Sequence, residues 1–151
     1  MLHEDIQTDL KAALEAGDDT RLSVLRDIKS AITNELVSEG IDTDETLPDE
    51  DVQAVIARLA KQRKESIAEF QAGGRDDLVK KEQKELEILE NYLPEPMSES
   101  ELEKLVESVI ADVGAEDMSD MGHVMGKAME EVGPATDGNT VKNIVQEKLS
   151  Q

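Results

Sequence analysis

The strongest constraint on the fold is the stretch from residue 52 to 94, VQAVIARLAKQRKESIAEFQAGGRDDLVKKEQKELEILENYLP. Apolar residues recur in it at steps of three and four, which is helical spacing and not the alternation of a strand. Gly73 and Gly74 separate two such patterns and permit a tight reversal of the chain. The stretch therefore predicts two long helices packed as an antiparallel hairpin. The apolar positions are Val52, Val55, Ile56, Leu59, Ala60, Ile67 and Phe70 in the first helix, and Leu78, Val79, Leu86, Leu89, Tyr92 and Leu93 in the second.

Three charged residues fall on the apolar faces of this hairpin. At about 100° per residue, Arg63 lies between Leu59 and Ile67, while Glu82 and Glu85 lie on the facing stripe. A reversal at the two glycines brings Arg63 opposite Glu85 and near Glu82. We expect a semi-buried structural ion pair that fixes the register, because buried charges are normally paired. A charged functional pocket is the alternative, although no nucleophile stands at a helical step from these residues.

The rest of the chain also has helical periodicity, and no segment predicts a strand. Two helices are expected before the hairpin, from Leu2 to Ala16 and from a cap at Asp18 to Gly40. Pro48 is expected at the first position of the next helix, because proline suits that position. The hairpin's second helix is expected to run to Leu93, where Pro94 stops it.

Pro94 and Pro96 mark the predicted domain boundary. The sequence predicts an N-terminal helical domain over 1–93, a proline-rich linker over 94–97 and a C-terminal domain over 98–151. Three short helices are expected in the last, beginning at a capping box at Ser98, near Ser119 and after Asp137. Each is too short to be stable alone, so the three must pack together. The predicted fold class is all-α, with four helices followed by three.

Charge limits the functions open to this chain. It has 36 acidic and 16 basic residues and a net charge of −20, which repels nucleic acid and anionic membranes at long range. Any RNA contact must therefore use a local basic patch. Cysteine is absent, and His3 and His123 have no second ligand at a metal spacing, so neither a metal nor a cofactor is expected. The acidic start and the lack of a long apolar run lead us to expect a cytoplasmic protein without membrane contact.

Basic residues gather on the predicted hairpin. Ordinary alternation with glutamates on a solvated face explains them as simply as a binding surface does. The candidates for phosphate contact are Lys61, Lys64, Arg75, Lys80, Lys81 and Lys84.

Gly122 and Gly126 form a second feature, four residues apart on one helical face in MGHVMGKAM. Close packing against a neighbouring helix is the interpretation that we favour. The alternative is close approach of a nucleic-acid backbone, with Lys127 beside the glycines.

Three segments together resemble the YqeY family: KQRKESIAEFQAGGRDDLVKKEQKELEILENYLP, DMGHVMGKAM and DGNTVKNIV. This family is similar to the C-terminal portion of the B subunit of the tRNA-dependent amidotransferase (GatB), and the resemblance covers nearly the whole chain. It implies an all-helical protein in two parts, similar to a segment that holds tRNA while other domains perform the chemistry. The family is often given a carbon–nitrogen ligase label with glutamine as amide donor, which we interpret as inherited from the fusion partner.

One loop departs from the family pattern. Where the family has basic residues in a sequence like PKVKGRADG, residues 130–138 read EEVGPATDG. The remaining tail candidates for tRNA contact are Gly122, Gly126, Lys127, Asn139, Lys142 and Asn143.

Three functions follow as hypotheses. The first is a tRNA-associated accessory module without catalysis, which the resemblance favours. The second is a protein-interaction adaptor with a helix-binding groove between hairpin and tail, which the charge favours. The third is an amide-transferring enzyme, for which the sequence offers neither a nucleophile nor a nucleotide site. For the first, we expect weak, salt-dependent binding carried by the tail, because Gly122 and Gly126 would let a backbone come close.

Overall fold

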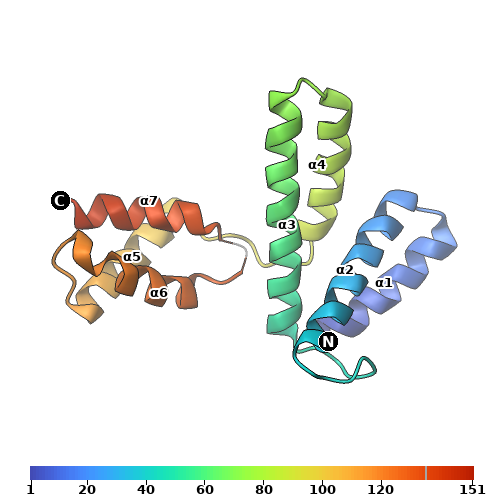
Figure 1. Ribbon diagram of the computed structural model, residues 1–151, viewed down its shortest axis with the longest axis horizontal. Coiled ribbons are helices and arrows are strands. Elements are labelled where there is room, and N and C mark those ends of the chain that lie inside the picture. Colours follow the sequence, from blue (N-terminus) through green and yellow to red (C-terminus); the bar gives the residue numbers. More distant parts are fainter. Residues whose placement is uncertain (135) are drawn as a thin grey trace. The chain divides into compact units, whose positions relative to one another are not determined.

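The computed structural model describes residues 1–134 and 136–151, and these form seven α-helices, one short 3₁₀ helix and no strand (Figure 1). The all-α prediction is therefore confirmed. The chain divides into two compact units, Met1–Leu93 and Pro94–Gln151, so the division falls at the first of the two prolines. We describe each unit by itself.

The N-terminal unit holds four helices: α1 (Leu2–Ala16), α2 (Asp19–Ser38), α3 (Asp49–Ala72) and α4 (Asp76–Glu90). Gly17 ends α1 in a left-handed conformation with φ 68°, which glycine adopts without strain. The Asp18 side chain then accepts a hydrogen bond from the backbone N–H of Arg21 at 3.1 Å and caps α2. Gly73 and Gly74, the latter with φ 70°, turn the chain between α3 and α4.

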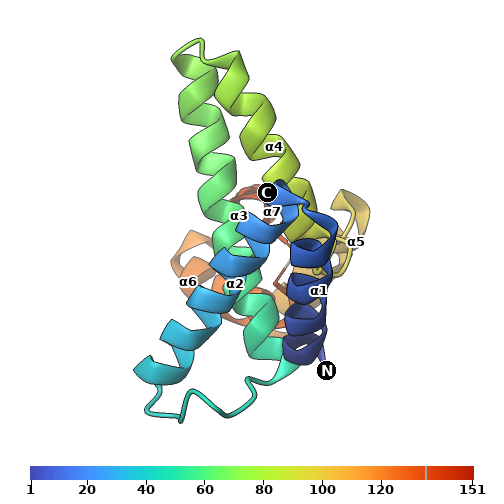
Figure 2. The same ribbon diagram turned by 90° about the vertical axis from the view of Figure 1, so that its right-hand side faces the viewer.

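The α3–α4 hairpin extends beyond the other two helices. The buried core of this unit includes Leu25 and Ile28 of α2, and it ends at Ala60 on α3 and Leu89 on α4. Phe70, nearer the turn, is only half-buried and lies outside that core. Figures 1 and 2 show the turn of the hairpin standing clear of α1 and α2. We call residues 61–84 the distal hairpin.

Two predicted helix ends are wrong by a few residues. α4 ends at Glu90 and not at Leu93. The N–H groups of Tyr92 and Leu93 donate to carbonyls only three residues back, and Leu93 precedes a proline, which disfavours helical conformation there. Tyr92 and Leu93 follow in a turn, yet both still pack against the core. Pro48 is the cap of α3 and not its first helical residue, since its ψ of 151° is extended.

His3 has a structural role that the sequence did not reveal. Its Nδ1 accepts a hydrogen bond from the backbone N–H of Leu47 at 3.0 Å. Because an amide can only donate here, Nδ1 carries no proton in this arrangement. Both residues are buried, so the bond ties the end of the loop before α3 to the start of α1.

The C-terminal unit, which we call the tail, contains α5 (Glu99–Val113), the 3₁₀ turn η1 (Met118–Asp120), α6 (Met121–Val132) and α7 (Gly138–Leu149). The predicted capping box is present: Ser98 Oγ accepts from the Glu101 N–H, and Glu101 accepts from the Ser98 N–H. Asp137 caps α7 through the Asn139 N–H at 3.0 Å. Ser119 lies in η1, two residues before α6 begins.

Residues 130–138 include Ala135, which lies outside the described residues. The tail has its own core, which includes Leu102, Val106, Val109, Val124, Ala128, Val141, Ile144 and Val145. No helix in the part of the chain that the structure describes has the length and apolar character needed to cross a membrane.

Candidate functional site

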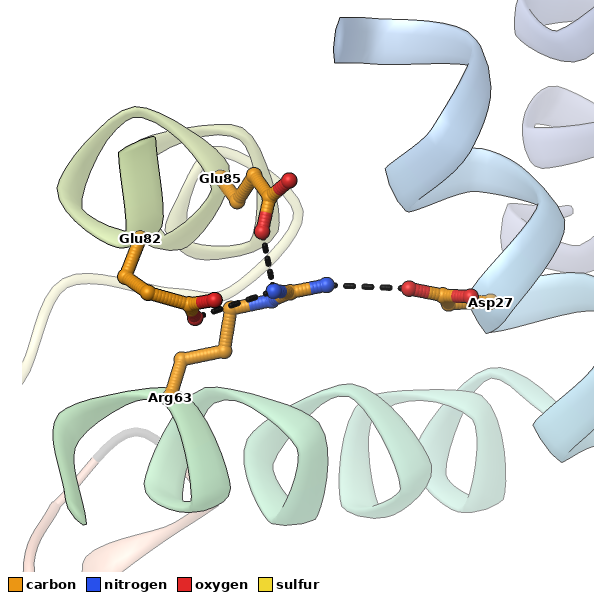
Figure 3. A network of polar contacts seen from close by, with 4 residues as sticks. All are labelled: Asp27, Arg63, Glu82 and Glu85. Carbon is orange, nitrogen blue, oxygen red and sulfur yellow. Dashed lines mark hydrogen bonds and ion pairs between the residues drawn. The ribbon is translucent and has the colours of Figure 1, made fainter. Parts of the chain in front are cut away.

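Arg63 lies at the centre of a network that joins three helices (Figure 3). Its Nη1 contacts Glu82 Oε2 at 3.1 Å and also contacts Glu85, so both carboxylates that the helical spacing placed opposite it are its partners. Its Nη2 pairs with Asp27 of α2 at 2.9 Å. Asp27 was missed by sequence reasoning, because no sequence signal says which side of α2 faces the hairpin.

Burial is graded across this network. Glu85 is buried with a side chain 6% exposed, Arg63 is 18% exposed, and Asp27 is 53% exposed. One planar guanidinium thus holds carboxylates from α2 and α4 at once, which its forked geometry permits. The arrangement fixes the register of the hairpin against α2. It contains no nucleophile that could take part in group transfer.

Tyr92 forms a second polar contact that the sequence did not predict. Its hydroxyl donates to Asp9 Oδ2 at 2.5 Å, and Arg21 Nη2 lies 3.5 Å from the same hydroxyl. Desolvation, followed by the hydrogen bond to Asp9, raises the pKa of Tyr92 above its ordinary value. The contact fastens the chain just after α4 to α1 and α2.

The distal hairpin carries a local excess of basic residues. Residues 61–84 contain seven of the sixteen basic residues but five of the thirty-six acidic ones. Arg75 pairs with neighbouring Asp77 at 3.4 Å, where both side chains are exposed. Five lysines are exposed and take part in no ion pair within the described residues: Lys61, Lys64, Lys80, Lys81 and Lys84.

The tail lysines lie in more acidic surroundings. Residues 94–151 hold four basic and thirteen acidic residues. Lys148 pairs with Glu107 at 2.8 Å, and Lys127 lies 3.9 Å from Asp112. Three further candidates of the tail are exposed on α7: Asn139, Lys142 and Asn143.

The packing expectation for the α6 glycines is wrong. Gly122 and Gly126 are exposed, and a Cβ placed on either would meet nothing within 4 Å. The buried stripe of α6 consists of Val124, Ala128 and Val132, and the glycines lie beside it rather than on it. No neighbouring helix of the tail therefore requires glycine at these two positions.

Metal binding has no geometric support in the described part of the chain. No group of three or more His, Asp or Glu side chains is arranged there to hold an ion.

Comparison with known proteins identifies the family. The sequence model of the family described as Yqey-like protein matches residues 3–149. A protein of Pyrenophora tritici-repentis named "Altered inheritance of mitochondria protein 41, mitochondrial" is 34% identical, over 94% of this chain and 77% of that protein. Proteins of the same name from Lachancea thermotolerans and Kluyveromyces lactis are 37% and 39% identical, over 72% and 81% of this chain.

The chain spans 58% and 66% of the length of those last two relatives. All three relatives are named as mitochondrial, which contradicts the cytoplasmic location expected from the sequence. Neither the acidic composition nor the lack of a long apolar run carries information about the compartment of the protein. The family match extends over nearly the whole chain, and with the all-helical fold in two units it shows that this protein belongs to the YqeY family.

Proposed function

We propose that the protein is a tRNA-associated accessory module without catalysis, and that its distal hairpin supplies the phosphate contacts. The observation that carries the proposal is the set of five exposed lysines without ion-pair partners in the described residues. Phosphate neutralisation by lysine and arginine supplies most of the affinity of non-specific nucleic-acid binding. The family's similarity to a tRNA-holding segment supplies the class of ligand.

The position of these lysines reduces the effect of the acidic remainder. Charges separated by more than about 10 Å are largely screened at moderate salt. A phosphate at the projecting end of the hairpin is therefore governed by nearby lysines, such as Lys80 and Lys84 one turn apart on α4. The net charge of −20 still slows approach, so binding is weak and is helped by magnesium.

From the sequence, we expected the tail to supply the phosphate contacts. The acidic surroundings of the tail lysines favour the hairpin instead. Lys148 has a close carboxylate partner and Lys127 a more distant one, so phosphate would have to compete with them. Lys142 and Asn139 remain secondary contacts in this proposal, whereas Asn143 lies beside Glu99 and Glu147 and contributes none.

Two variants with equal changes of charge separate the hairpin from the tail. The hairpin variant carries Lys80→Glu, Lys81→Glu and Lys84→Glu, and the tail variant carries Lys104→Glu, Lys127→Glu and Lys142→Glu. All six lysines except Lys127 are exposed, and Lys127 is half-buried, so both variants should fold. Binding of total tRNA is measured with magnesium at low salt. We expect the hairpin variant to lose binding and the tail variant to weaken it only several-fold.

The opposite ranking of the two variants would assign the site to the tail. If the unaltered protein binds no tRNA under these conditions, the RNA proposal fails. A protein-interaction adaptor, favoured by the large acidic excess, then takes its place. Amide transfer would need an activated nucleophile or a nucleotide site, and no observation favours it.

A further inference from the structure

A groove opens between the start of α5 and α7, within the tail. Its volume is about 280 Å³. Leu102 and Ile144, both nearly buried, form its floor, and half-buried Met97 forms a wall. Its rim is polar and exposed: Glu99, Thr140, Asn143 and Glu147.

The groove is held in place by the cap of α5. Ser98 is the N-cap, so Met97 precedes the cap and Leu102 is the fourth helical residue. An apolar pair at these positions packs together and fixes the direction from which the chain enters the helix. Met97 packs against the tail core that contains Leu102. The apolar part of the groove is therefore formed before any partner arrives.

Two carboxylates line this groove, Glu99 of α5 and Glu147 of α7. Glu103 and Glu107 continue the four-residue spacing of Glu99 along α5, beyond the groove lining. Beyond the groove lining, Lys148 pairs with Glu107, and that hydrogen bond raises the pKa of Lys148, with Glu103 and Glu147 contributing. This side of the tail thus already holds one ammonium group.

The described residues that line the groove itself include no cation. Among the described residues, neither Glu99 nor Glu147 takes part in an ion pair. An apolar floor beside two unpaired carboxylates is complementary to an apolar side chain flanked by basic ones. The same carboxylates repel phosphate, so Asn143 is badly placed for RNA contact.

We propose that this groove holds a basic amphipathic helix of a partner protein. One apolar side chain of the partner rests on Leu102 and Ile144, and a lysine or arginine on each side pairs with Glu99 and Glu147. The volume lies just below the 300–1,000 Å³ of small-molecule sites, which suits a side chain better than a whole ligand. This inference does not rest on the RNA function.

The test uses the full-length protein and a labelled synthetic helix of leucine and lysine, about fifteen residues long, with leucines along one face. Glu99→Gln with Glu147→Gln is compared with Glu130→Gln and Glu131→Gln. The control pair is exposed on α6, removes the same charge and leaves the groove intact. We expect the groove variant to lose about tenfold in affinity, as two exposed ion pairs would give, and the control less than twofold.

A second peptide, with serine replacing every leucine, tests the apolar floor. It should bind at least tenfold more weakly than the leucine peptide, and equally to both variants. Methyl NMR of the unaltered protein should show the leucine peptide shifting the signals of Met97 and Ile144. Equal losses in the two glutamine variants, or shifts spread over the acidic surface without Met97 and Ile144, would overturn the proposal.

Discussion

Arg63 shows how a charge on an apolar face becomes a structural requirement. Its removal would leave Glu85, whose side chain is 6% exposed, without the cation that compensates its burial. Losing one partner of a buried pair costs far more than losing an exposed pair, because the remaining charge stays desolvated. Arg58 provides the contrast within the same helix, since its pair with Glu35 is largely exposed.

Arg63→Ala should lower the free energy of unfolding by about 3 kcal/mol. This value is at the low end for a buried pair because the Asp27 side chain is exposed to solvent. Arg58→Ala should cost less than about 1 kcal/mol. Urea unfolding of the two variants measures both values. Equal costs for the two changes would show that the Arg63 network is no more than a surface pair.

A companion variant distinguishes a lost pair from lost packing. Arg63→Met combined with Glu85→Leu removes both charges and keeps apolar volume at the site. Replacing both members of a buried pair by apolar residues is often neutral. We expect the double variant to recover part of the stability that Arg63→Ala loses, because Glu82 stays without its partner, and no recovery would contradict the ion-pair account.

Tyr92 gives a pH dependence that can be followed by itself, because it is the only tyrosine and the chain has no tryptophan. Burial and Asp9 raise its pKa in the folded state above the unfolded value of about 10. Folding therefore favours the neutral phenol. This stability is complete below pH 10 and is lost as the pH rises towards the folded-state pKa.

The midpoint at which phenolate absorbance appears should accordingly lie above pH 10 in the folded protein. In urea, this midpoint should return to about pH 10. Tyr92→Phe should remove the signal and cost about 1.5 kcal/mol, because Asp9 loses a hydrogen bond at a half-buried site. Folded protein that titrates at 10 would show that the contact with Asp9 does not persist in solution.

At the scale of helices, the sequence predicted those features that depend only on residues close together in the chain. Asp18, Ser98 and Gly17 were identified as helix ends because capping depends on residues within one turn. The hairpin's register followed from two facing stripes and a two-glycine turn. Asp27 and the contact of Tyr92 with Asp9 could not be predicted, because they depend on how helices far apart in the sequence pack.

The packing prediction for the two glycines of α6 was wrong for a related reason. Spacing placed Gly122 and Gly126 on one face, but it did not tell whether that face meets another helix. The structure places them in open surroundings, where glycine only lowers helix stability.

Replacing Gly122 and Gly126 by alanine should each stabilise the protein by about 0.5 to 1 kcal/mol. Gly133→Ala is the control in the opposite direction: its φ of 78° with ψ of 170° is a region that essentially only glycine adopts, so alanine there should destabilise the protein by about 1 to 3 kcal/mol. Urea midpoints rank the three variants. Destabilisation by Gly122→Ala or Gly126→Ala would restore the packing interpretation.

The same two alanine variants bear on RNA binding. If the hairpin supplies the phosphate contacts, tRNA affinity should be unchanged in both. A clear loss would mean that a nucleic-acid backbone approaches α6, as the sequence first suggested.

Across the whole molecule, charge is distributed unevenly between the two units. The distal hairpin of the N-terminal unit has more basic than acidic residues, whereas the tail has more than three times as many acidic as basic ones. A protein with a net charge of −20 can therefore present one surface to phosphates and another to a basic partner. We predict two separable binding activities, one on each unit.

The salt dependence of tRNA binding at fixed magnesium shows whether the distal hairpin holds the phosphates. Each phosphate contact contributes about 0.7 to 0.9 to the slope of log affinity against log salt, so five hairpin lysines predict a slope of about −4. Replacing Lys80, Lys81 and Lys84 by glutamine should make the slope shallower by about 2 to 2.7. An unchanged slope in this variant would contradict the assignment of phosphate contacts to the hairpin.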